Sequence, residues 1–223
     1  MTQGNYVPGR RPRLLDMAGL VILALSGLVF LVAIPVRGDF IDPGKDMQGF
    51  AASAVSGRFL VAWLAIGGGG VLELYGLAVL YSAMQGSTGA AWGQWGLPLA
   101  AFGTVLLVGI AAALALTAPT IGELYLQGET QVTEVAIEMF QSSVGLTLLI
   151  ASGLAYIVGS LIAGIGIWRW EPLMRWAAIP FVLQSVLLTA ASGYSLPLEM
   201  FGALLLAGSG GWMAYRVWSA APF

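Results

Sequence analysis

The chain has 223 residues, of which 58% are hydrophobic and 9% are charged, and its formal net charge is -2. Soluble domains carry about 25% charged residues, so the composition excludes an ordinary soluble protein and predicts an all-α integral membrane protein. Cysteine and histidine are both absent. This excludes disulfides, Ser-His-Asp or Cys-His catalysis, and any haem or metal held by those side chains. We therefore expect no metal and no cofactor, with a bound lipid or lipophile left open.

Six apolar stretches predict a single domain with six transmembrane helices, because one span needs roughly 20 apolar residues. The expected spans lie at about 14–36, 60–84, 95–118, 137–168, 176–192 and 198–218. A short surface helix is expected near residues 50–54, in the loop after the first span. The fourth helix is longer than a bilayer requires, so we expect one continuous helix that begins before the membrane.

The second span contains one charged residue, Glu73, near its middle. A charge at the bilayer centre costs on the order of 3 kcal/mol on the insertion scale. We expect the carboxyl either to stay protonated or to face a polar partner inside the bundle. Two interpretations are open. Glu73 is a site for a proton or ligand, or it is a neutral carboxyl that fixes helix packing.

Small residues repeat every seven positions in two spans and predict close helix packing. Glu73 borders the first of these lines, four residues after Gly69. The line in the second span consists of Ala62, Gly69, Gly76 and Ala83, and that in the fourth span includes Gly145, Ser152, Gly159 and Gly166.

Polar side chains in later spans are candidate partners for Glu73. Gln184 lies within the fifth span and can bridge helices by hydrogen bonds. Tyr156 and Ser152 in the fourth span complete the set of buried polar candidates. We assign no catalytic residue.

Basic residues predict that both termini are cytoplasmic, because inner loops carry more Lys and Arg. The inner side receives Arg10, Arg11, Arg13, Arg169, Arg175 and Arg216, and the outer side receives Arg37, Lys45 and Arg58. Beyond the N-terminal arginines the sequence has no basic patch, so no nucleic-acid partner is expected.

The last third of the chain has a recognisable series of motifs. Gly159-Ser160 is followed by GIGIWR at 164–169, by Leu196-Pro197 and by GGWMAYRVW at 210–218. Residues 159–218 resemble uncharacterised bacterial six-helix membrane proteins that are grouped as a domain of unknown function. The resemblance implies six spans and a bacterial cytoplasmic (inner) membrane, and it implies no activity.

Three functions remain open from the sequence. The first is a non-catalytic accessory or assembly subunit, whose partners are the lipid bilayer and other membrane-protein subunits. The second is a small proton- or cation-coupled carrier that uses Glu73. The third is an intramembrane binder or enzyme acting on a lipid, quinone or pigment, with Glu73, Gln184 and Tyr156 at its site.

Overall fold

The computed structural model describes residues 14–219, and these residues form helices and no strand, which confirms the all-α prediction. The helices are α1 Leu14–Arg37, α2 Met47–Ala54, α3 Gly57–Met84, α4 Ala90–Leu126, α5 Val132–Gln141, α6 Ser143–Trp170, the 3-10 helix η1 Pro172–Met174, α7 Arg175–Ala190 and α8 Leu196–Ser219. Within residues 14–219, four helical segments are long and apolar enough to cross a membrane: α1, α3, α4 and the stretch Val132–Trp170. The helix α7 is apolar but shorter.

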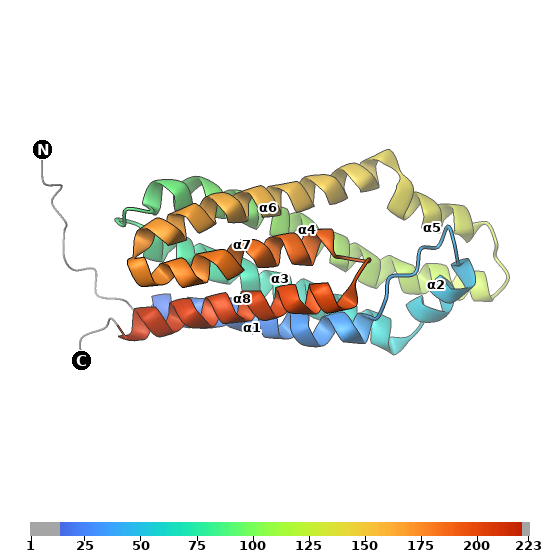
Figure 1. Ribbon diagram of the computed structural model, residues 1–223. Coiled ribbons are helices and arrows are strands. Elements are labelled where there is room, and N and C mark those ends of the chain that lie inside the picture. The colour runs from blue at the N-terminus through green and yellow to red at the C-terminus, as the bar shows by residue number, and fades with distance from the viewer. Residues whose placement is uncertain (1–13, 220–223) are drawn as a thin grey trace, which may run out of the picture.

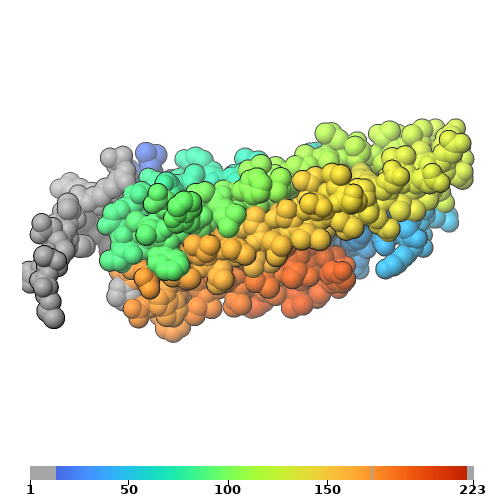
Figure 2. Space-filling view, turned by 90° about the horizontal axis from the view of Figure 1, so that it is seen from above, coloured from blue at the N-terminus to red at the C-terminus, as the bar shows by residue number. Residues whose placement is uncertain are grey.

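Six long helices form a closed ring in the order α1, α3, α4, α6, α7 and α8, and α8 packs back against α1. The bundle is elongated, and α1 begins at the same end where α8 stops (Figure 1). The short helices α2 and α5 lie at the opposite end, where α4 and the start of α6 project beyond α7 and α8 (Figures 1 and 2). We call the end where α1 begins and α8 stops the terminal end, and the end that carries α2 and α5 the α2–α5 end.

Both ends of the third predicted span differ from the sequence prediction. The helix α4 has 37 residues and includes Pro98 and Pro119, so the loops expected on either side of its span are shorter than predicted. Its start is set by the Gly89 carbonyl, which accepts hydrogen bonds from Trp92 and Gly93. Proline is tolerated inside helices of this kind, because packing against neighbours compensates for the missing N–H donor.

The expected continuous fourth helix is wrong. It is broken at Ser142, whose extended backbone separates α5 from α6. The Ser142 hydroxyl oxygen accepts a hydrogen bond from the Gly145 N–H at 3.1 Å and so caps α6. A serine cap offers the backbone a local alternative to a continuous helix. Gly145 consequently lies against the end of α5, at Met139 and Ser142, and not against a neighbouring helix as the small-residue line predicted.

Glycines elsewhere allow the ring helices to approach closely. A Cβ atom added at Gly76 would lie 2.6 Å from Leu23 Cβ of α1, and one added at Gly159 would lie 2.7 Å from Ala100 Cα of α4. Gly69 packs against Phe30, and Gly166 packs against Met84. Ala62 is buried and Ala83 is half-buried. The small residues of α3 therefore face α1, and those of α6 beyond Gly145 face α4.

The two ends of the ring are filled differently. Large apolar side chains, among them Leu23, Met84, Ile167, Phe181 and Met213, pack the interior of the terminal end. A second, smaller core lies under α2 and α5. Between these two cores the interior is open.

Candidate functional site

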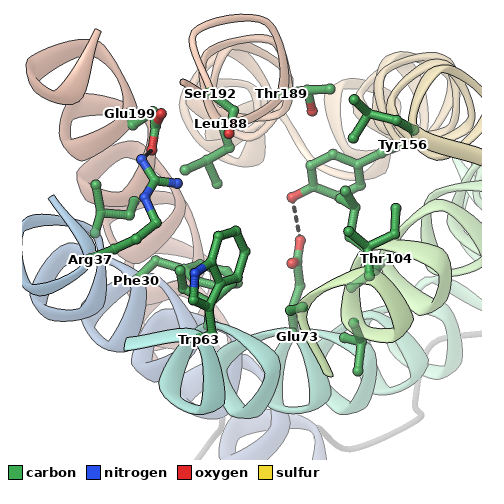
Figure 3. A pocket seen from close by; sticks show the side chains of 18 residues that line it. Phe30, Arg37, Trp63, Glu73, Thr104, Tyr156, Leu188, Thr189, Ser192 and Glu199 are labelled. Atoms are coloured by element: carbon green, nitrogen blue, oxygen red, sulfur yellow. Dashed lines mark hydrogen bonds and ion pairs between the residues drawn. The ribbon is translucent and has the colours of Figure 1, made fainter. Parts of the chain in front are cut away.

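A cavity of about 150 Å³ lies inside the ring, between the packed terminal end and the cap made by α2 and α5. All six ring helices and the turn after α7 contribute to its wall, which is mostly apolar (Figure 3). Eight side chains with polar atoms interrupt the apolar wall: Arg37, Trp63, Glu73, Thr104, Tyr156, Thr189, Ser192 and Glu199.

The floor of the cavity is formed by Glu73 and Tyr156, which are both buried. The Tyr156 hydroxyl is hydrogen-bonded to Glu73 Oε1 (Figure 3). On its other side the same hydroxyl lies 2.9 Å from Gln184 Oε1, which is also buried. The Glu73–Tyr156 hydrogen bond joins α3 to α6 across the ring, and the Tyr156–Gln184 contact joins α6 to α7.

The backbone positions these three side chains. Gly103 of α4 lies so close to α6 that a Cβ atom there would be 2.5 Å from the Tyr156 nitrogen. Gly76, three residues after Glu73, holds α3 against α1. Both helices are thus fixed near the residue that carries the polar side chain, in the middle of each helix.

The three oxygens of this cluster require two protons if both contacts are hydrogen bonds, and the tyrosine hydroxyl supplies one. In the first arrangement a protonated Glu73 donates to Tyr156, and Tyr156 donates to Gln184 Oε1. In the second, Glu73 is a carboxylate that accepts from Tyr156, and the Gln184 amide is turned so that its nitrogen donates to the hydroxyl. Gln184 Nε2 is buried without a partner as placed, so either orientation leaves one amide atom unbonded. The cluster can therefore hold Glu73 charged or neutral with the same three side chains.

Two further polar atoms on the cavity wall have no hydrogen-bond partner. These are Trp63 Nε1, which can only donate, and Thr189 Oγ1. Buried polar atoms are usually hydrogen-bonded. Both residues line this cavity, and Trp63 also lines a smaller hollow beside it, so their unsatisfied atoms indicate places for a ligand atom or an ordered water.

A buried ion pair forms part of the cavity wall. Arg37 Nη2 lies 2.8 Å from Glu199 Oε2, and the two side chains are 8% and 3% exposed. Glu199 Oε1 also accepts a hydrogen bond of 2.7 Å from the Gly193 N–H, which a positive φ of 78° presents to it. The Arg37 guanidinium lies over the Trp63 ring, 5.8 Å from its centroid. Arg37 ends α1 and Glu199 begins α8, so each charge also complements its helix dipole.

The structure brings together Glu73, Tyr156 and Gln184 from the sequence candidates and places Ser152 apart from them. The Ser152 hydroxyl donates to the Leu149 carbonyl of its own helix at 2.8 Å. Sequence reasoning missed Trp63, Thr189 and the Arg37–Glu199 pair. One signal was present for the pair, because Arg37 ends the first apolar stretch and Glu199 begins the last at the same expected side. Within residues 14–219, no three acidic side chains gather where they could hold a metal ion.

Comparison with known proteins gave no matching family model, no matching curated protein and no matching solved structure. The class of the protein is therefore defined by its fold and site alone. It is an all-helical bundle with helices long and apolar enough to cross a membrane, and it encloses a small cavity with a buried carboxyl–phenol–amide cluster.

Proposed function

We propose that this protein is a six-span membrane protein that binds a small planar lipophile carrying a carbonyl group, of the quinone kind, in the cavity above Glu73. The observation that carries the proposal is the combination of an apolar cavity with unpaired hydrogen-bonding atoms in its wall. Ligand sites are typically apolar hollows with a few convergent polar groups.

The size and polarity of the cavity define the ligand. An apolar cavity of about 150 Å³ holds a single benzene ring in another protein. Trp63 Nε1 can only donate a hydrogen bond, so the ligand has to carry an acceptor on that side. The Thr189 hydroxyl and the Tyr156–Glu73 cluster offer further hydrogen-bond partners. A ring with carbonyl oxygens satisfies these groups without bringing a charge into the interior.

The start of α6 supports entry from the lipid phase. Residues 146–150 are exposed on every side of the helix, and four of these five residues are large and aliphatic. Leu149 is 51% exposed and also lines the cavity. The cavity therefore approaches the apolar surface beside Leu149, where a lipophile could enter directly from the bilayer.

Filling the cavity should remove the ligand. Ala111 is buried on the cavity wall, and Ala111→Phe adds a ring of about the size that the cavity holds. Ala112, the next residue of α4, is exposed, so Ala112→Phe adds the same ring outside the cavity. Purified proteins are extracted with organic solvent, and non-phospholipid lipophiles are quantified by mass spectrometry. We expect Ala111→Phe to carry at least tenfold less of the bound compound than the wild type. Ala112→Phe should carry as much as the wild type. Equal amounts in all three would refute the proposal.

The proposed orientation places both termini in the cytoplasm of a bacterial cell, with the terminal end of the ring at the inner face. Gly86 lies in the turn between α3 and α4 at that end, and Gly128 follows α4 at the α2–α5 end. Alkaline phosphatase and fluorescent-protein fusions at these two glycines should report a cytoplasmic and an external position respectively. The opposite pattern at both sites contradicts the orientation, and the same side at both contradicts the span of α4.

The other two hypotheses from the sequence stay predictions. The carrier hypothesis gains support from the two proton arrangements of the Glu73 cluster, and its test is pH-driven flux in liposomes. The accessory-subunit hypothesis gains support from the exposed apolar start of α6, and its test is a co-purifying subunit that is lost when this surface is made polar.

A further inference from the structure

A second hollow lies on the outside of the ring, between α6 and α7 near the terminal end. It is a groove of about 530 Å³. Its walls are apolar and come from Leu161, Gly164 and Ile165 of α6 and from Ala178, Ile179 and Val182 of α7. It is separate from the cavity above Glu73, since the two share no lining residue.

Two arginines lie at the terminal end of this groove. Arg169 lines it directly, and Arg175 lies over Trp168, another lining residue, with 5.6 Å between the guanidinium carbon and the ring centroid. Arg169 is held in the same way over Trp92 at 5.3 Å. These stacking contacts restrain the two guanidinium groups without neutralising them.

No acidic side chain of the described part of the chain pairs with either arginine. Arg169 and Arg175 are both exposed, and within residues 14–219 neither forms an ion pair. Glu171 lies between them in the sequence, but its carboxylate pairs with Arg216 at 2.9 Å. The groove thus ends at two positive groups that have hydrogen-bond donors to spare.

We propose that this groove binds one anionic phospholipid, with an acyl chain between α6 and α7 and its phosphate at Arg169 and Arg175. Guanidinium groups bind phosphate through paired hydrogen bonds. Basic pockets between membrane helices on the cytoplasmic side are suited to anionic head groups, and tryptophans lie at head-group depth. The two arginines should bind phosphatidylglycerol, whose head group has a net negative charge, in preference to phosphatidylcholine, whose phosphate is neutralised by its own choline.

Native mass spectrometry of the full chain in mild detergent tests this site. Phosphatidylglycerol and phosphatidylcholine with identical chains are added in equal amounts. The wild type should retain phosphatidylglycerol with about tenfold preference for the first lipid bound, and Arg169→Gln with Arg175→Gln should lose that preference. Arg58→Gln, which removes an exposed arginine at the α2–α5 end, should keep it.

Two outcomes overturn the proposal. One is equal retention of the two lipids by the wild type, a comparison that does not depend on any variant folding. The other is an unchanged preference in the double glutamine variant. Arg169→Lys with Arg175→Lys keeps both charges and should retain a reduced preference, which separates loss of charge from loss of structure.

Discussion

Glu199→Gln is expected to lower the free energy of unfolding by about 3–5 kcal/mol, because it leaves the buried guanidinium of Arg37 without a counter-charge. The two side chains are 8% and 3% exposed, so bulk solvent does little to offset the lost charge of the carboxylate. The glutamine oxygen can still accept the Gly193 N–H, and its NH2 group then lies toward the Arg37 guanidinium, where a donor faces a donor. The measurement is the apparent unfolding temperature in detergent, read from the fraction of protein that stays monodisperse in size-exclusion chromatography after heating.

The protein supplies its own control for this effect. Arg216 and Glu171 form an ion pair of 2.9 Å, but their side chains are 19% and 38% exposed. Pairs of this kind contribute about 0–1 kcal/mol, so Glu171→Gln should change stability little. Replacing both partners of the buried pair, as Arg37→Leu with Glu199→Gln, should recover most of the loss. Equal losses from Glu199→Gln and Glu171→Gln would contradict the burial argument.

Gly159→Ala is the second large effect that we expect. The new Cβ atom would lie 2.7 Å from Ala100 Cα and 2.8 Å from the Gly96 carbonyl oxygen, both backbone atoms of α4. No rotamer change can relieve that overlap, so α4 and α6 have to move apart. Overpacking costs typically about 1–3 kcal/mol, and the rigidity of both backbones places this substitution at the upper end. The same movement displaces Tyr156, one turn earlier in α6, from Glu73.

Gly109→Ala is the matched control, since Gly109 also lies in α4 but a Cβ atom there would meet nothing within 4 Å. We expect its unfolding temperature to equal that of the wild type or to exceed it, because alanine favours helix. The contrast is measured as the monodisperse fraction and the unfolding temperature of the two variants side by side. A Gly159→Ala protein as stable as Gly109→Ala would show that α4 and α6 are not in the contact described.

The sequence located the buried carboxyl and offered Gln184, Tyr156 and Ser152 as candidates near it, but it could not choose among them. Glu73 stands out because a charge inside an apolar span is costly, and that argument needs only local sequence. Tyr156 lies 83 positions further along the chain, and Gln184 another 28. Which of the polar side chains meets Glu73 depends on the order of helices around the ring, and no local pattern carries that order.

The break at Ser142 and the Arg37–Glu199 pair show two other limits. Apolar periodicity continues across Ser142, so the pattern predicted one helix, and only the serine cap and the turn geometry separate α5 from α6. The sequence predicts Arg37 in the loop after the first span, as a residue that sets orientation, since the burial of a side chain cannot be deduced from composition. Its burial follows from α8 packing beside α1, a contact between the two ends of the chain.

If the cavity above Glu73 holds a lipophile, the purified wild-type protein should carry a measurable amount of that compound. The protein is purified in mild detergent with prolonged washing, and the extracted non-phospholipid lipophiles are quantified per mole of chain. We expect one carbonyl-bearing ring compound at a ratio of about one per chain, because the cavity has room for a single ring. A wild-type protein that carries no such compound, and takes up none when a short-chain quinone is supplied, would contradict the proposal.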